Sequence, residues 1–415
     1  MGHAKLSLTN PNTEYPDFLR NVDSKNTSES HDSSPILIRM YEKDAIYRLK
    51  DLVSKHKNTE VIDNYSEQYA ELLLSKNAHL YRANYDVQVA SIKNLLEEHY
   101  AGEATWKLGS WVYFPWNGQL VHILAQEDFE TLRTIRNREL ITEKEQHKLL
   151  DFKVAAFGMS VGSAGALALA ISGISRQIKL IDGAIISGSN LNRILTGVSS
   201  VGKNKAHVVG QIIYEMNPYS SISYFEKVKK ENIAQIIDKP WKVDLIIDEI
   251  DDIEMKVLIR HEARSRRIPV IMATELGDTI MLDVERYDEE PDRPLFHGII
   301  PHIEDLLDSP IENYREWTKH AVNIIDPINM TIKMQKSLLK IGTSIVTHPQ
   351  LGSTVMMTGG MLAFATKNIA IGNEIKSGRY IVSLEKELLK DHRTLKYRRH
   401  HRKHTKTLQK AIKSM

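Results

Sequence analysis

The sequence predicts an α/β protein in which a largely parallel β-sheet carries helices on both faces. A mainly helical N-terminal extension and a helical C-terminal region are expected to flank this sheet. Two observations support the fold class. Five short, apolar, β-branched-rich runs follow one another between residues 153 and 274, and most are separated by segments with helical periodicity. Strands covered on both faces are almost continuously apolar, and their alternation with helices is typical of parallel sheets.

The five expected strands are KVAAF (153–157), QIKLID (177–182), SISYF (221–225), DLIID (244–248) and VIMAT (270–274). Between them, AGALALAISGI and KAHVVGQIIYEM have apolar residues at the spacing of a helix that packs on a sheet. Parallel sheets bind ligands beyond the carboxyl ends of their strands. We therefore expect the functional residues in the loops that follow these runs.

We divide the chain into five parts. Residues 1–35 are rich in Ser, Asn and Asp, which predicts disorder. Residues 36–150 have helical periodicity and include an aromatic segment that predicts a hairpin turning at Asn117-Gly118. Residues 151–285 form the expected α/β core, residues 286–385 supply loops and helices that complete it, and residues 386–415 are a basic tail.

The composition excludes several kinds of site. The chain contains no cysteine, so it cannot form a disulfide, a thiolate zinc site or a cysteine nucleophile. No apolar run approaches the roughly 20 residues of a membrane helix, and the first residues lack a secretory signal pattern. We expect a cytoplasmic protein without a membrane partner. The net charge is only +2, so nucleic acid is expected to bind only through the basic tail, whose alternative role is solubility.

A loop of small residues follows the first strand and precedes a helix. Small residues let a phosphate approach the backbone, and a helix N-terminus offers free N–H groups. The same residues also form the G-x-S-x-G pattern of hydrolases, in which Ser160 would be the nucleophile, with Asp248 and His297 in the required order. Both interpretations stay open on this loop alone. The residues expected to bind phosphate are Gly158, Ser160, Gly162 and Ser163.

The second strand ends at Asp182, which lies 24 residues after Gly158. An acidic residue near this spacing binds ribose hydroxyls in dinucleotide-binding folds. We therefore expect Asp182 to bind the ribose of a nucleotide. Nicotinamide-dependent enzymes share this feature, so an NAD(P)-dependent oxidoreductase is one alternative function.

Three further motifs follow in order: SNLNR (189–193), VGKNKA (201–206) and DEIDD (248–252). With the glycine loop and Asp182 they make residues 153–284 resemble the ThiF/MoeB superfamily of ubiquitin-activating adenylyltransferases. The resemblance implies a Rossmann-like core that uses ATP and Mg²⁺ to activate a carboxylate as an acyl-adenylate. The implied acceptor is a protein C-terminus, a peptide or a small molecule.

The resemblance also implies roles for individual residues. Arg193 and Lys205 should hold the phosphates as catalytic cations, and Asn190 should help to orient them. Asp251 should bind Mg²⁺, a hard cation that prefers carboxylate oxygen. In the family that this chain resembles, an arginine upstream of the glycine loop reaches the nucleotide of a partner subunit. Arg136 lies at the corresponding position, so the resemblance implies a homodimer.

The chain also departs from the family pattern. Ala184 replaces the second acidic residue of D-x-D, Ile194 replaces a glutamine, and the loop contains serine in place of glycine. Because the chain lacks cysteine, we expect it to stop at the acyl-adenylate and to form no thioester of its own. A second alternative is a nucleotide-binding scaffold without catalysis. Acceptor recognition is expected from the segment that contains Arg293, Phe296 and His297.

Overall fold

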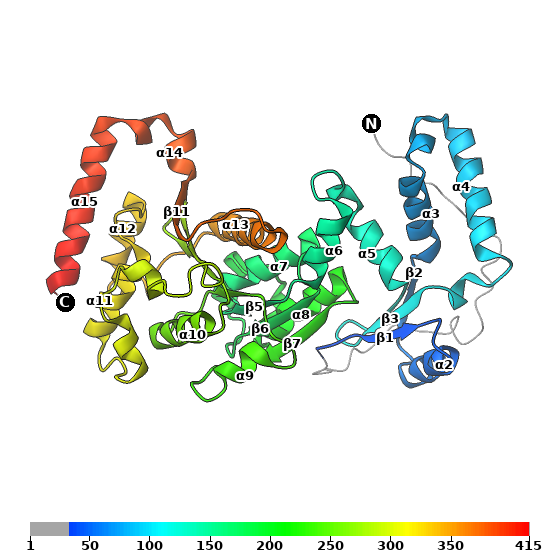
Figure 1. Cartoon of the computed structure of the whole chain (residues 1–415), viewed down its shortest axis with the longest axis horizontal. Helices are drawn as coiled ribbons and strands as arrows, with labels where there is room; N and C mark the ends of the chain where they lie inside the picture. The colour runs from blue at the N-terminus through cyan, green and yellow to red at the C-terminus, as the bar shows by residue number, and fades with distance from the viewer. Residues whose placement is uncertain (1–32, 415) are drawn as a thin grey trace. The chain divides into compact units, whose positions relative to one another are not determined.

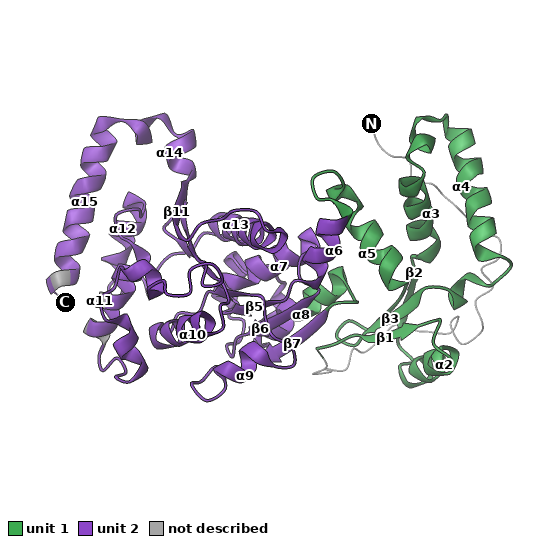
Figure 2. Ribbon diagram, viewed as in Figure 1, with its two compact units in different colours: residues 1–143, 211–220 green, residues 144–210, 221–415 purple. Residues whose placement is uncertain are grey.

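The computed structural model describes residues 33–414, and these fall into two compact units (Figure 2). Unit 1 comprises residues up to Glu143 together with Gln211–Ser220, and unit 2 comprises Lys144–Gly210 and Ser221–Met415. Apart from its last three residues, the segment predicted to be disordered (1–35) lies outside the described residues. None of the helices in the described part of the chain combines the length and the hydropathy that a membrane crossing requires.

Unit 1 contains a four-stranded sheet in the order β1-β3-β4-β2 (Figure 1). β3 and β4 form an antiparallel pair joined at Asn117-Gly118, with Trp111 opposite His122. Two strands that the periodicity did not reveal, β1 and β2, complete the sheet, because four-residue strands are too short to show a clear alternation. The elements are β1 Ile36–Arg39, α2 Ala45–Lys55, β2 Glu60–Asp63, α3 Tyr65–Lys76, α4 Tyr85–Tyr100, β3 Ser110–Phe114, β4 Gln119–Ile123 and α5 Gln126–Thr134.

Unit 2 is built on a seven-stranded sheet in the order β11-β10-β9-β8-β5-β6-β7. The five predicted strands are all present and parallel, which confirms the largely parallel α/β fold. Two antiparallel strands that the sequence analysis did not identify, β10 and β11, extend the sheet beyond β9. The bounds are β5 Val154–Phe157, β6 Gln177–Ile181, β7 Ser221–Phe225, β8 Leu245–Asp248, β9 Val270–Glu275, β10 Thr279–Glu285 and β11 Gly378–Ser383.

Helices cover both faces of this sheet (Figure 1). α7 and α13 pack together on one face, where a side chain at Gly359 would collide with the carbonyl oxygen of Ala164. α9 and α10 cover the other face and share a core with Ala155 and Phe157. These two residues are two positions apart in β5, so their side chains point to the same face. The helices are α6 Glu143–Asp151, α7 Gly162–Ser172, α8 Lys205–Met216, α9 Ile233–Asp238, α10 Ile253–Ser265, α11 Tyr314–Ile325, α12 Ile332–Leu338, α13 Gly352–Ile371, α14 Leu384–Leu388 and α15 Leu395–Ser414.

Candidate functional site

The loop between β5 and α7 lies where the adjacent strands β5, β6 and β8 end. Gly158 adopts a φ of 85°, and a Cβ atom there would lie 2.4 Å from the carbonyl oxygen of Glu249. Only glycine fits both constraints, since L-residues disfavour this conformation. The loop then enters α7 at Gly162, and the Ser163 hydroxyl donates to the Ser160 carbonyl at 2.7 Å. The free N–H groups of the first turn of α7 therefore lie next to a tightly folded loop. Such N–H groups can bind an anion.

Asp182 connects this loop to the end of β6. One carboxylate oxygen accepts the Met159 N–H at 2.7 Å, and the other accepts the Ala184 N–H at 2.7 Å. Each ionised carboxylate oxygen can accept a second hydrogen bond. Asp182 can therefore shape the loop and still accept hydroxyl protons from a ligand.

The SNLNR segment forms a short 3₁₀-helix, Gly188–Asn192, that ends beside the loop. Asn190 is buried, and its Oδ1 accepts the Ser187 N–H at 3.0 Å, so this side chain closes the turn. Arg193 follows, and its Nε donates to the Ser160 hydroxyl at 3.3 Å. Partial burial lowers the pKa of Arg193, while the carboxylates of Glu275 and Asp251 oppose that shift. The guanidinium remains charged, because arginine is not deprotonated in proteins.

Lys205 is the first residue of α8, and its backbone N–H donates to the Ala184 carbonyl at 2.9 Å. Its side chain is half-buried and makes no hydrogen bond or ion pair with another described residue. The preceding Asn204, which the sequence analysis did not select, donates to the Asp182 carbonyl at 3.0 Å. It also accepts the His207 N–H at 3.2 Å, as an N-terminal cap does. The VGKNKA motif thus anchors the start of α8 to the end of β6.

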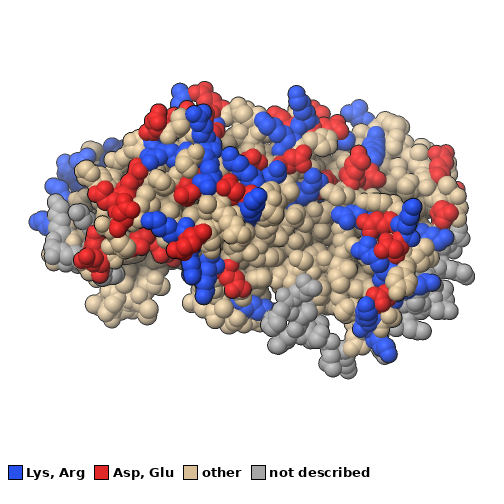
Figure 3. Space-filling view, turned by 60° about the horizontal axis from the view of Figure 1, so that its bottom comes forward, with Lys and Arg blue, Asp and Glu red and all other residues tan. Residues whose placement is uncertain are grey.

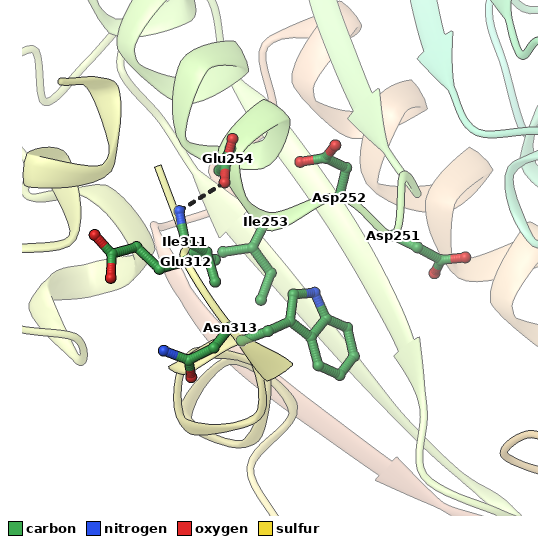
Figure 4. Close-up of a pocket in the computed structure, with 8 residues that line it drawn as sticks. Asp251, Asp252, Ile253, Glu254, Ile311, Glu312 and Asn313 are labelled. Atoms are coloured by element: carbon green, nitrogen blue, oxygen red, sulfur yellow. Dashed lines mark hydrogen bonds between the residues drawn. The ribbon is translucent and has the colours of Figure 1, made fainter. Parts of the chain in front are cut away.

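The two acidic residues after β8 have different roles. Asp252 accepts the Met255 N–H at 3.0 Å and caps α10. Asp251 is exposed and lies within electrostatic range of Arg193. Both border a cavity of about 630 Å³ (Figure 4). On the other side of this cavity the Ile311 N–H donates to the Glu254 carboxylate at 2.8 Å. Asp251 is therefore the carboxylate of this pair that is available to a cation.

The sequence analysis missed three residues near Arg193, namely Glu275, Gln350 and His348. Glu275 ends β9 with only 8% of its surface exposed, and one of its carboxyl oxygens accepts the Gln350 amide at 3.1 Å. Its other oxygen is buried without a hydrogen-bond partner in the described part of the chain. Burial raises the pKa of Glu275 to about 7, although Gln350 and Arg193 oppose this. His348, the third residue, lies within electrostatic range of Asp251 and Arg193.

The segment between α12 and α13 brings these missed residues to the site. The Gln350 carbonyl accepts the Asn192 side-chain amide at 2.9 Å, so the segment lies against the SNLNR turn. A Cβ atom on Gly352 would approach the Asn192 carbonyl oxygen to 2.3 Å, which confirms how closely the two backbones pack. A charged residue at the end of an apolar strand was the available signal for Glu275. His348 and Gln350 carry no local signal of this kind.

The expectation for Phe296 is wrong. Phe296 is 1% exposed, its N–H donates to the Glu285 carboxylate at 2.7 Å, and its ring covers the Arg260 guanidinium at 4.0 Å. It therefore belongs to the core on the α10 face of the sheet. His297 contacts Asp283 at 3.1 Å and also accepts from Arg293, so these polar side chains interact with one another.

The hydrolase interpretation is wrong as well. Asp248 is fully buried and pairs with Arg260 and with Lys256, the latter at 3.2 Å. Burial alone would raise the pKa of Asp248, but these two cations outweigh burial and hold it below its usual value. Since His297 contacts Asp283 instead, Ser160, Asp248 and His297 do not form a catalytic triad.

Most of the predicted site residues gather at one edge of the sheet in unit 2. These residues lie in the loops that follow β5, β6 and β8 or in the first turns of the helices α7 and α8 that those loops enter. They are Gly158, Ser160, Gly162, Ser163, Asp182, Asn190, Arg193, Lys205 and Asp251. Arg136 lies in unit 1, in the 3₁₀-helix Ile135–Asn137, where its side chain is exposed. The residues in unit 2 thus provide a loop that suits a phosphate, two cations (Arg193 and Lys205) and two carboxylates (Asp182 and Asp251).

Comparisons with known proteins identify similar sequences and structures. The chain is 34% identical over 280 residues to the uncharacterized protein MT1398 of Mycobacterium tuberculosis (strain CDC 1551 / Oshkosh), covering 67% of this chain and 38% of that protein. It is 32% identical over 117 residues to the probable molybdopterin-synthase adenylyltransferase of Porphyra purpurea, covering 28% of this chain and 30% of that protein. The chain thus spans 38% of the length of the first relative and 30% of the length of the second.

Among solved structures, the tRNA N6-threonylcarbamoyladenosine dehydratase TcdA of E. coli is similar with a TM-score of 0.41 and 19% identity. That similarity covers 58% of this chain and 95% of TcdA. The ThiF family model matches residues 132–405, which includes the sheet of unit 2 and every motif described above. The chain therefore belongs to the ThiF family.

Proposed function

We propose that this chain is an ATP- and Mg²⁺-dependent adenylyltransferase that activates a carboxylate as an acyl-adenylate. A carboxylate oxygen of the acceptor attacks the α-phosphorus of ATP, the bond to the bridging oxygen breaks, and pyrophosphate leaves. Because negative charge increases on the leaving group, such a site needs fixed cations more than an acid–base pair. The observation that carries the proposal is Arg193, held against the phosphate-type loop by Ser160 and within electrostatic range of Asp251. Asp182 accepts the Met159 N–H of the same loop.

The phosphates and the ribose of ATP have matching groups in unit 2. The backbone N–H groups of the Gly158–Ser163 loop and of the α7 N-terminus suit the phosphates. Arg193 lies at the same loop, and Lys205 offers an ammonium without a described partner. Asp182 retains acceptor capacity for the ribose hydroxyls. In this proposal Arg193 and Lys205 stabilise the charge that develops on pyrophosphate.

The residues of this site fit a Mg²⁺ ion that is bound partly by the protein and partly by the phosphates of ATP. Within residues 33–414 no group of three or more His, Asp or Glu side chains could hold a metal. Mg²⁺ in phosphate-transfer sites commonly uses one or two carboxylates, water and the substrate phosphates. Asp251 is exposed and makes no hydrogen bond with another described residue, so it can serve as such a carboxylate. The ion would neutralise phosphate charge there.

The acceptor in this proposal is the carboxylate of a protein C-terminus, a peptide or a small molecule. The absence of cysteine means that this chain offers no thiol to the adenylate. In this proposal the adenylate passes to the thiol or sulfur of a partner, or is captured directly by an amine or amide. We also propose a homodimer in which Arg136, exposed and without a described ion pair, reaches the nucleotide of the partner.

ATP–pyrophosphate exchange with a panel of carboxylate-ended peptides and ubiquitin-like proteins tests this function. Asp251→Asn should abolish exchange by weakening Mg²⁺ binding. Asp252→Asn is the matched control: it removes the neighbouring charge but keeps an oxygen that can cap α10, and it should retain exchange. Exchange that survives in Asp251→Asn would refute the role given to this residue.

The same samples distinguish the alternative functions. Tight ATP binding without exchange across the whole panel would favour a non-catalytic nucleotide-binding scaffold. Preference for NAD(P) over ATP in a direct binding titration would favour an oxidoreductase. For the dimer, mixing an Arg136→Ala chain with an Arg193→Gln chain should restore exchange, because each mixed dimer contains one intact composite site. Failure to restore it would argue against the arginine acting across the interface.

A further inference from the structure

The helix α15, Leu395–Ser414, has an unusual distribution of charge. Its sequence contains no Asp or Glu. Its exposed Lys and Arg side chains form no ion pair with other described residues. They are Lys396, Arg398, Arg399, Arg402, Lys403, Lys406 and Lys410. We call this set the α15 cationic face.

The opposite half of α15 is fixed to the protein. Leu408 is 2% exposed and packs with Met281 and Met334. Thr405 accepts the Gln335 amide at 2.8 Å, and the His401 ring contacts the Met330 carbonyl at 2.7 Å. At about 100° per residue the seven cations cover one continuous arc of about 160°, opposite these contacts. These contacts attach α15 to the rest of unit 2 and leave the α15 cationic face exposed to solvent.

The rest of the chain carries the opposite net charge. From Lys390 onward the sequence has ten Lys and Arg residues and one Asp, which is +9, so the other 389 residues carry −7 of the total +2. Over most of the face drawn in Figure 3, basic and acidic side chains are interspersed. Five of the α15 residues, by contrast, border one hollow of about 420 Å³ without any acidic residue. They are Arg399, Arg402, Lys403, Lys406 and Lys410. A polyanion is therefore attracted to this helix in particular.

We propose that the α15 cationic face binds the phosphate backbone of a nucleic acid. Between Lys396 and Lys410 the outward half contains no apolar side chain, so this stretch offers nothing to insert into lipid, although the exposed Leu395 precedes it. A surface of this kind contacts phosphates without reading sequence. The 15 residues from Lys396 to Lys410 span about 21 Å of helix, which matches about six phosphates along one strand.

The salt dependence of nucleic-acid binding tests this proposal. Because the measurement needs no ATP, a negative result would not bear on the proposed adenylation. Fluorescence anisotropy of the full chain with labelled 20-nucleotide DNA, single-stranded and duplex, would be measured from 50 to 300 mM salt. The test variant is Arg399→Gln, Arg402→Gln, Lys403→Gln and Lys406→Gln together. Each phosphate contact contributes about 0.9 to the slope of log K against log salt for duplex and about 0.7 for single strands. The four changes should therefore reduce the slope by up to about 3.6 and about 2.8, respectively.

The matched control removes the same charge elsewhere: Lys57→Gln, Lys93→Gln, Lys144→Gln and Lys242→Gln, all exposed. Its slope should equal that of the unaltered chain. A single Arg402→Gln change, which should lower the duplex slope by about 0.9, replaces the quadruple variant if that variant fails to fold. No binding at 50 mM salt, or equal slopes in test and control, would overturn the proposal. Binding to phosphatidylserine vesicles but not to nucleic acid, lost in the test variant, would also overturn it and assign the face to membranes.

Discussion

Replacing Glu275 with glutamine should make the stability of unit 2 less dependent on pH. Glu275 is buried at the end of β9, with one oxygen bonded to Gln350 and the other without a partner in the described residues. Burial raises its pKa from 4.5 to about 7. A carboxyl in such a place is more stable with its proton than without it.

The sign and size of the effect follow from this shift. Between about pH 4.5 and 7 the folded state holds a proton that the unfolded state has lost, so stability is greatest below pH 4.5 and falls as the pH rises to about 7. A shift of 2.5 units corresponds to about 3 kcal/mol at 1.36 kcal/mol per unit. Glutamine cannot ionise, so Glu275→Gln should avoid this loss. The stability of the variant relative to the unaltered chain should rise by about 3 kcal/mol between pH 4.5 and 8.

Urea unfolding at pH 5, 6, 7 and 8, followed by tryptophan fluorescence, measures this difference. Glu374→Gln is the control, because Glu374 is an exposed carboxylate paired only with Lys376. Its difference from the unaltered chain should not change with pH by more than about 0.5 kcal/mol. A constant difference for Glu275→Gln from pH 5 to 8 would show that Glu275 ionises normally and would refute the reasoning.

Three further changes test separate parts of unit 2. Gly158→Ala should cost at least about 1–2 kcal/mol of stability and weaken ATP binding, because the residue has φ 85° and its Cβ would collide with Glu249. Calorimetry should find Gly188→Ala harmless in comparison, since a Cβ there meets nothing within 4 Å; equal effects would contradict the steric argument. Arg260→Met should cost about 3–5 kcal/mol in urea unfolding, because it removes the buried cation that pairs with both Asp248 and Glu285 and leaves Asp248 with Lys256 alone. One turn later, Arg264→Met breaks a partly exposed pair with Glu304 and should cost about 1 kcal/mol or less, so similar losses would refute the role of burial. Arg193→Lys keeps the charge but loses the guanidinium contacts to Ser160 and Ser189, and should weaken ATP binding about tenfold, or 1.4 kcal/mol, by titration. An unchanged Kd would exclude Arg193 from phosphate binding.

Local sequence patterns were sufficient to predict the parallel sheet and most of the candidate site. All five predicted strands are present, because short apolar runs between amphipathic helices determine strands buried on both faces. Asp182 and Arg193 follow β6, and Asp251 follows β8; these are the two strands that flank β5 in the sheet. Parallel strands place their carboxyl ends at one edge, so the order of motifs along the chain already predicts their proximity.

Tertiary packing decided what local patterns cannot encode. β10 and β11 lie almost a hundred residues apart and find each other only in the folded sheet. Phe296 was expected at the acceptor site because its segment lies where the resembling family has its acceptor loops, yet the side chain is buried and covers Arg260 from α10. The place of a segment along the chain does not determine which residues surround each of its side chains in space.

The clearest example is Glu275. By itself the sequence determined that a carboxylate ends an apolar strand next to the expected site. Only the fold brings Gln350, 75 residues later, against it and excludes water from its second oxygen. The pKa of a carboxyl depends on the solvent and charges within a few ångströms, and those are set by packing between distant segments. The sequence therefore determined the kinds of groups at this edge of the sheet, whereas the tertiary structure decided their protonation and their partners.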